Sequence, residues 1–122
     1  MKSGVILFAH GSRAAEANEN AVALGELVKE QFGVEPLLVA FMELAEPSLE
    51  EGIRQLIEKE GVDNVKVVPL FLNNGIHLKR DIPCLLEELR PQYPHVTINL
   101  GRPFGVDKRL AQLIHDRIQE LP

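Results

Sequence analysis

The sequence predicts an α/β fold in which a parallel β-sheet is covered by helices. Two observations support this: four short apolar segments alternate with four segments of helical periodicity, and the first three apolar segments are continuous or nearly continuous runs. Unbroken runs are typical of strands buried on both faces, as in a parallel sheet. The alternation of strands with helices favours crossover connections that lie over the sheet. With 122 residues, 45% of them hydrophobic, the chain is expected to form one domain over residues 1–122.

The predicted strands differ in pattern. The three runs cover residues 5–9, 37–41 and 65–72, and the third contains Lys66. In the fourth strand, over residues 96–100, three apolar residues alternate with Thr97 and Asn99, which indicates an edge strand. Pro69 lies inside the third run, and because proline cannot donate a ladder hydrogen bond it predicts a bulge or an early end of pairing.

Each predicted helix has one apolar stripe, which is expected to face the core. The four stripes are Ala17, Ala21, Leu24 and Val28; Leu49, Ile53, Leu56 and Ile57; Ile82, Leu85, Leu86 and Leu89; and Leu110, Ile114, Ile118 and Leu121. Pro47 lies near the first turn of the second helix, where its missing N–H costs least. Asp81 and Asp107 are placed to cap the third and fourth helices.

Right-handed crossovers restrict how these elements can assemble. They favour a flavodoxin-like three-layer sandwich, with a four-stranded parallel sheet in the order 2-1-3-4 and helices on both faces. In such sheets ligands bind beyond the carboxyl ends of the strands, where the strand order reverses. The sequence therefore predicts a binding crevice between the ends of the first and third strands.

Two histidines and one carboxylate converge on this predicted rim. His10 follows the first strand, Glu43 follows the second, and His77 lies in the loop after the third. Each alone is explained as an ordinary loop residue, but as a set they match the ligands of cobalt, nickel or iron ions. Imidazole also takes up protons near neutral pH. Gly11 and Gly75, close to the histidines, permit close backbone approaches.

Charge and composition narrow the class of ligand. The net charge is −5 and tryptophan is absent, which argues against nucleic-acid binding. Four basic residues nevertheless lie beside the rim loops, and a local basic surface attracts anionic ligands: they are Arg13, Lys79, Arg80 and Arg102. Neither residues 1–3 nor residues 5–9 are long enough for a signal peptide or a membrane span. A single cysteine, Cys84, fits a reducing compartment, so we expect a cytoplasmic protein without a membrane partner.

Three segments of the rim together form a specific set. They are His10-Gly11-Ser12-Arg13; residues 41–49, which contain Glu43-Leu44-Ala45-Glu46-Pro47; and residues 69–83, which read Pro-x-Phe-Leu-x-x-Gly-x-His-x-x-x-Asp-Ile-Pro. The third is the most specific, whereas His-Gly-Ser-Arg alone is a weak signal. In order and spacing, and over essentially the whole chain, these segments resemble the class II chelatases of the CbiX/SirB family.

The resemblance implies a chelatase-like fold and a lyase that inserts a divalent metal ion into sirohydrochlorin without ATP. Cobalt, for cobalamin biosynthesis, is the expected ion, with iron for sirohaem or nickel for coenzyme F430 as alternatives. The ion is then a substrate, and no cofactor is bound permanently. By motif position, His10 and His77 are the catalytic pair, and His10, Glu43 and His77 bind the metal. The implied substrate-binding residues are Ser12, Arg13, Gly75, Lys79, Arg80 and Arg102.

The resemblance also bears on assembly. A domain of this length has a radius of gyration of about 14 Å, enough to cover one face of a substituted tetrapyrrole. Larger relatives join two such lobes in one chain, so a homodimer around the cleft is expected.

Other classes of protein are a poorer match. A histidine phosphatase needs arginine directly before its histidine, where Ala9 lies. A receiver domain needs an aspartate at the end of the third strand, where Leu72 and Asn73 lie. A flavin-binding carrier needs a loop rich in hydroxyl groups. A non-catalytic protein that binds metal or tetrapyrrole would use the same ligands, and this alternative stays open.

Overall fold

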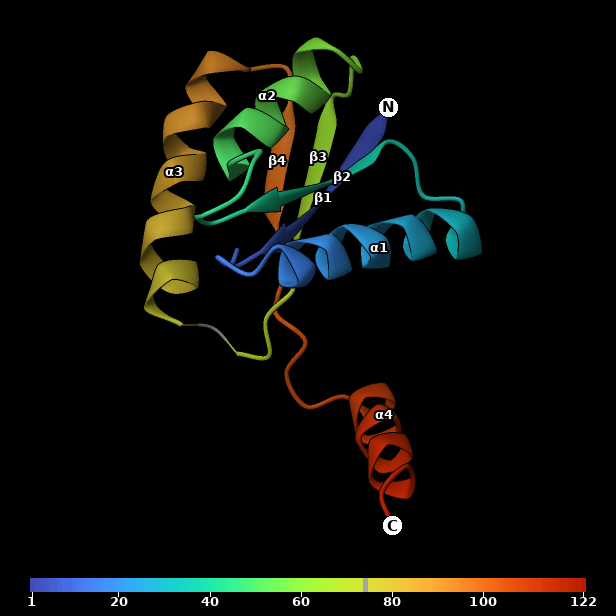
Figure 1. Cartoon of the computed structure of the whole chain (residues 1–122). Helices are drawn as coiled ribbons and strands as arrows, with labels where there is room; N and C mark the ends of the chain where they lie inside the picture. Colours follow the sequence, from blue (N-terminus) through green and yellow to red (C-terminus); the bar gives the residue numbers. More distant parts are fainter. Residues whose placement is uncertain (74) are drawn as a thin grey trace.

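The computed structural model describes residues 1–73 and 75–122, apart from the side chains of residues 77 and 78. The strands form one parallel sheet in the order β2-β1-β3-β4, which confirms the predicted topology (Figure 1). In chain order the elements are β1 (Ser3–Ala9), α1 (Ala15–Phe32), β2 (Leu37–Phe41), α2 (Leu49–Glu58), β3 (Asn64–Pro69), the π-helix η1 (His77–Asp81), α3 (Ile82–Leu89), the 3₁₀-helix η2 (Arg90–Gln92), β4 (Thr97–Leu100) and α4 (Lys108–Gln119).

As the sequence predicts, β4 lies at the edge of the sheet and the pairing of β3 ends early. β4 is the outer strand beside β3, with Ile98 buried and Thr97 and Asn99 exposed. Pairing of β3 with β4 stops at Val67 and Leu100, before the proline, and β3 itself ends at Pro69. The missing N–H of proline therefore falls where the ladder has already ended on that side.

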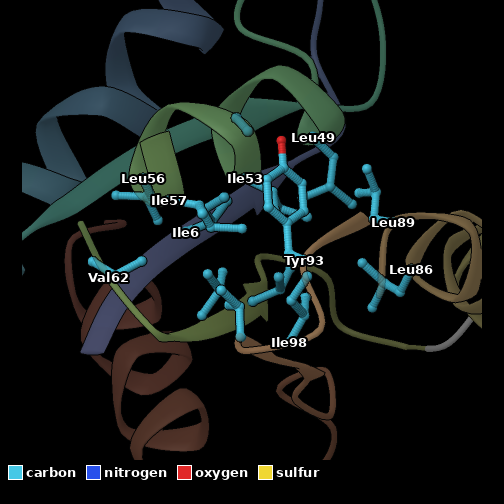
Figure 2. Close-up of a cluster of buried hydrophobic side chains, with 14 of the residues drawn as sticks. Ile6, Leu49, Ile53, Leu56, Ile57, Val62, Leu86, Leu89, Tyr93 and Ile98 are labelled. Carbon is cyan, nitrogen blue, oxygen red and sulfur yellow. The ribbon is translucent and has the colours of Figure 1, made fainter. Parts of the chain in front are cut away.

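One face of the sheet is covered by α2 and α3, and it forms the larger core (Figure 2). The predicted stripe of α2 is fully buried, and Ile53, Leu56 and Leu86 are at most 1% exposed. Tyr93 closes this core beside α2, where its hydroxyl accepts a hydrogen bond from Arg54 at 2.8 Å and donates one to Glu58. The polar end of a buried ring is thereby satisfied at the edge of an apolar layer.

The helix starts differ in part from the prediction. Ser48 caps α2 and forms a capping box with Glu51, so Pro47 lies one residue before the cap and outside the first turn. Asp81 has helical backbone angles and makes no capping hydrogen bond, because the helical stretch already begins with η1. Asp107 caps α4 as predicted, accepting a hydrogen bond from the backbone N–H of Arg109 at 2.8 Å.

The opposite face is covered by α1, and α4 lies apart from it, beyond the carboxyl ends of β3 and β4 (Figure 1). Gly25 of α1 is buried, whereas Leu24 is 51% exposed. α4 has no buried residue, so the prediction that its stripe faces the core is wrong for this chain on its own. Among the described residues, no helix, α4 included, is both long and apolar enough to cross a membrane.

Candidate functional site

The pairing of β1 with β2 continues past the ends of both strands and builds the rim. The backbone N–H of Met42 donates to the carbonyl of Ala9 at 2.9 Å, and that of Glu43 donates to the carbonyl of His10 at 3.2 Å. Because these bonds extend the parallel ladder, His10 and Glu43 lie side by side at the carboxyl edge of the sheet. The predicted convergence of the first two rim segments is present in the structure.

Gly11 makes this close approach feasible. Its φ is +90°, and a Cβ atom at this position would lie 1.8 Å from the carbonyl oxygen of Glu43. No side chain fits there, and the backbone conformation itself favours glycine. At Gly75 no described atom lies within 4 Å of an added Cβ. The expected close approach is thus found at Gly11 and not at Gly75.

The imidazole of His10 is exposed but held on two sides. Its Nδ1 lies 3.8 Å from Oε1 of Glu43 and 3.2 Å from the carbonyl oxygen of Gly11. Its ring meets the ring of Phe71 edge-on at a centroid distance of 6.2 Å, and Phe71 packs in the same way on buried Phe8 at 5.8 Å. A ring nitrogen that faces oxygen acceptors is the protonated one in the neutral tautomer, which leaves the lone pair on Nε2 for a ligand.

His77 opens η1, the turn that leads into α3. The backbone N–H of Lys79 donates to the carbonyl of Gly75 at 3.1 Å, so the helical stretch begins directly after the β3 loop. Single π turns inside helices occur frequently at functional sites. The side chain of His77 lies outside the described part, so its pairing with His10 stays a prediction. Within the described residues, no three His, Cys, Asp or Glu side chains gather into a metal-binding group.

The start of α1 is fixed by a clamp that the sequence reasoning missed. Asn18 accepts a hydrogen bond from the backbone N–H of Ser12 at 2.9 Å and donates one to the Ser12 carbonyl at 2.8 Å. The Ser12 hydroxyl accepts from the N–H of Ala14 at 3.0 Å. In the sequence, the only indication of these hydrogen bonds is an asparagine near the start of the helix, and such a residue is too common to predict them.

Phe71, whose ring lies against that of His10, is part of the third rim segment, but the sequence did not indicate its role.

The predicted basic residues are exposed around the same edge. Arg13 follows the clamped loop, and Lys79 and Arg80 lie within η1. Arg102 follows β4. The pKa of Asp107 is held below its ordinary value mainly by hydrogen bonds from Arg109, and the positive charge of Arg102 adds a smaller effect. The segment after β4 is joined to the β3 loop, because the N–H groups of residues 104 and 105 donate to the carbonyls of residues 71 and 72 at 2.9 and 2.8 Å. The basic side chains thus come from three neighbouring segments.

Comparison with known proteins places the chain in a family. The family model CbiX matches residues 4–121. The chain belongs to the CbiX family. It is 36% identical to a sirohydrochlorin cobaltochelatase from Sulfurisphaera tokodaii over 118 residues, which cover 97% of this chain and 92% of that one.

Longer members of the family match over one part of their length. The CbiX-family chain is 39% identical to a sirohydrochlorin ferrochelatase from Priestia megaterium over 95% of its own residues but only 43% of the relative. The crystal structure of the sirohydrochlorin chelatase SirB from Bacillus subtilis subspecies spizizenii in complex with cobalt superposes with a TM-score of 0.90 at 31% identity, covering 99% of this chain and 51% of that one. The chain therefore spans about half the length of these relatives.

Proposed function

We propose that this CbiX-family chain is a sirohydrochlorin chelatase, which inserts a divalent metal ion into the macrocycle without ATP. The observation that carries the proposal is the exposed imidazole of His10, fixed beside Glu43 at the carboxyl edge that leads to η1. One relative that matches this chain over nearly its full length is a sirohydrochlorin chelatase, and so is a longer relative of which the chain covers 43%. The chemistry of the residues and the family thus agree.

His10 and His77 are the proposed catalytic and metal-binding pair. Insertion places M²⁺ in the ring and displaces two pyrrole protons, so acceptors are needed for both. Neutral imidazole can first bind the ion through its lone pair and then, once the ion has moved to the pyrrole nitrogens, accept a proton. Glu43 is proposed as the third metal-binding group, because its carboxylate oxygen lies 3.8 Å from Nδ1 of His10. A site with few protein ligands holds the ion loosely, as delivery requires.

The rim is proposed to hold the macrocycle through its carboxylates. Arginine and lysine pair with carboxylates by charge-assisted hydrogen bonds, and the proposed contacts are Ser12, Arg13, Gly75, Lys79, Arg80 and Arg102. Because the Ser12 hydroxyl already accepts from Ala14, its contribution to substrate is as a donor. The basic groups are all exposed, so each is accessible to an anionic ligand.

Cobalt is the proposed ion, with iron and nickel as alternatives. The ligand types fit all three ions, and the relatives include both a cobaltochelatase and a ferrochelatase. The deciding assay follows the change in the absorption spectrum of sirohydrochlorin with each ion in turn. Insertion of cobalt faster than iron or nickel supports the choice; a clear preference for another ion contradicts it.

Catalysis separates this proposal from a passive binding protein. His10→Ala is expected to slow insertion roughly 100-fold or more, while His95→Ala, an exposed histidine before β4 at the amino end of the sheet, leaves the rate unchanged. His77→Ala is expected to match His10→Ala. Stoichiometric binding of ion or macrocycle without turnover, or equal activity of the His10 and His95 variants, would overturn the assignment.

We further propose a homodimer in the cytoplasm. One copy offers a single edge with basic groups and leaves the far face of a bound macrocycle open, so a second copy would complete the enclosure. The single cysteine, which is exposed and free, suits a reducing compartment.

A further inference from the structure

Leu44 is an apolar residue in a backbone conformation that leucine disfavours. Its φ is +64°, and within the described part of the chain it is the only residue other than glycine with a positive φ. Glycine and asparagine adopt this left-handed conformation much more readily than leucine does. Strained residues of this kind gather at functional sites, where the surrounding structure holds them in place. The backbone conformation therefore gives no reason for a leucine at this position.

The apolar cores give no reason for this leucine either. Leu44 is 56% exposed, whereas the next residue, Ala45, packs against the core on the α1 side of the sheet. Among the described residues, neither of the two cores includes Leu44. A single exposed leucine is ordinary, but an exposed leucine in a strained conformation at a candidate site indicates a contact with a ligand.

Leu44 follows the closest approach between two rim segments. The carbonyl of Glu43, which belongs to the peptide group before Leu44, is the atom that an added Cβ at Gly11 would meet at 1.8 Å. The N–H of Glu43 donates to the carbonyl of His10 at 3.2 Å. The peptide group that leads into Leu44 is thus fixed against the backbone beside His10, so the strained leucine belongs to the same rim as the imidazole.

Exposed apolar side chains also come from the segment on the other side of His10. β1 lies between β2 and β3 in the sheet, so the segments after β2 and β3 flank the one that carries His10. The segment after β3 contains Leu72, which is 61% exposed, and Ile76, which is 58% exposed. Neighbouring strands lie about 4.8 Å apart, so the two flanking segments leave the sheet about 10 Å apart. That separation suits a flat ligand centred near His10.

We propose that Leu44 is a substrate-contact residue, which packs with Leu72 and Ile76 against the plane of the macrocycle while His10 delivers the ion to its centre. This inference rests on the proposed function, because it names contacts of the same substrate. Exposed apolar residues at a candidate site mark the surface that a ligand covers. The contact offsets the strain at Leu44, since the apolar side chain is buried only when the ligand is bound.

The two kinds of exposed side chain at this edge match the chemistry of a tetrapyrrole. Its ring is flat and apolar, and its carboxylates lie on the periphery. Basic side chains that pair with carboxylates come from the segments after β1 and β3, in which Arg13, Lys79 and Arg80 are exposed. A small polycarboxylate needs the basic residues alone, whereas a macrocycle also uses the apolar ones.

Titration of the whole chain with metal-free sirohydrochlorin, followed by the absorption spectrum of the macrocycle, tests the contact. Asparagine has nearly the shape of leucine but is polar, so Leu44→Asn is expected to raise the dissociation constant roughly tenfold or more. Leu44→Met keeps an apolar contact and should bind nearly as well as the parent. Phe32→Asn is the matched control, because Phe32 is 73% exposed at the other end of α1, and it should leave binding unchanged. Equal binding by Leu44→Asn and the parent overturns the proposal.

Thermal unfolding separates a substrate contact from a structural role. Asparagine tolerates the left-handed conformation better than leucine, so Leu44→Asn should melt at the same temperature as the parent or higher. A lower melting temperature would mean that the leucine stabilises its own chain, and would overturn the proposal.

Ionic strength separates an apolar contact from ion pairing. Salt screens exposed charges, so the loss of affinity caused by Arg13→Ala should shrink as salt is added. The loss caused by Leu44→Asn should stay the same at low and high salt. If it shrinks as well, Leu44 acts by positioning charged groups, and the proposed contact is wrong.

The insertion assay distinguishes a failure of this inference from a failure of the proposed function. Leu44→Asn should raise the KM for the macrocycle roughly tenfold and leave kcat unchanged, because the contact lies outside the reacting centre. Insertion by the parent with no effect of Leu44→Asn on KM overturns the inference and leaves the function standing. Binding of the macrocycle that depends on Leu44, without insertion of any ion, supports the contact and contradicts the function. No binding of the macrocycle by the parent overturns both.

Discussion

The two faces of the sheet differ in how many apolar residues of their helices are buried. On one face, α2 buries its whole apolar stripe and α3 buries most of its own, around a core in which Ile53 is 0% exposed. On the other face, α1 has Gly25 as its only buried residue among those described, and α4 has none. An apolar stripe therefore predicts that a helix exists, but not whether the chain's own core buries that stripe.

The largest expected contrast is in core stability. Ile53→Ala on the closed face should lower the free energy of unfolding by about 2–5 kcal/mol, because it removes packed atoms and leaves a cavity. Leu24→Ala on the open face should cost under about 1 kcal/mol in the monomer, since Leu24 is half exposed. Urea unfolding at a concentration where the chain is monomeric gives both values. Similar losses at the two positions would contradict the division into a closed and an open face.

At the rim, Gly11→Ala should be the next most damaging change. It combines a positive φ with a clash against the Glu43 carbonyl, so we expect a loss of roughly 2–3 kcal/mol and a displaced His10. Gly33→Ala also has a positive φ, +63°, but open space around it, and should cost only about 1 kcal/mol. Thermal unfolding compares the variants, and an equal cost would mean that the close approach is not constrained.

The helix caps provide a smaller test of the same contrast. Ser48→Ala removes the cap of packed α2 and should lower global stability by about 1 kcal/mol. Asp107→Ala removes the cap of α4, and in the monomer it should loosen α4 alone, because α4 shares no buried core with the rest. Amide hydrogen exchange distinguishes the two. Global loosening by Asp107→Ala would show that α4 packs on its own chain.

The smallest expected effect depends on pH. Hydrogen bonds from the backbone N–H and then the hydroxyl of Ser48 hold the pKa of the Glu51 carboxyl below its ordinary value of 4.5. A carboxyl whose pKa is lowered by folding stabilises the fold above its unfolded pKa and loses that contribution as pH falls through the folded value. Glu51→Gln should therefore be less stable than the parent near neutral pH and approach it below about pH 4. Urea midpoints across this range check the sign.

Most of the fold could be predicted, because unbroken apolar runs and right-handed crossovers leave few topologies. The edge position of β4 followed from Thr97 and Asn99, and the end of pairing from Pro69. The cap at Asp81 was predicted wrongly, since nothing in the local sequence distinguishes a capping aspartate from one inside a π turn. The position of α4 could not be predicted, because α4 has the same kind of apolar stripe as the packed helices and yet has no buried residue.

The site was predictable in outline and less so in detail. Strand order alone brings His10 beside Glu43, and the structure confirms it. The ring contact of Phe71 with His10 and the hydrogen bonds between Asn18 and the Ser12 backbone depend on how side chains pack, which the spacing of residues along the sequence does not reveal. Gly11 could be singled out because it follows His10. The reason why a glycine is required there, the nearby carbonyl of Glu43, comes from a segment that is distant in the sequence.

The two backbone hydrogen bonds that join residues 104 and 105 to residues 71 and 72 have a mechanical consequence. They join the segment that leads into α4 to the loop after β3, which carries Phe71 against the ring of His10 and continues into η1. The position of α4 and the geometry beside His10 are thus linked through the backbone. Any free energy of coupling between a ligand at this edge and the placement of α4 is the same in both directions.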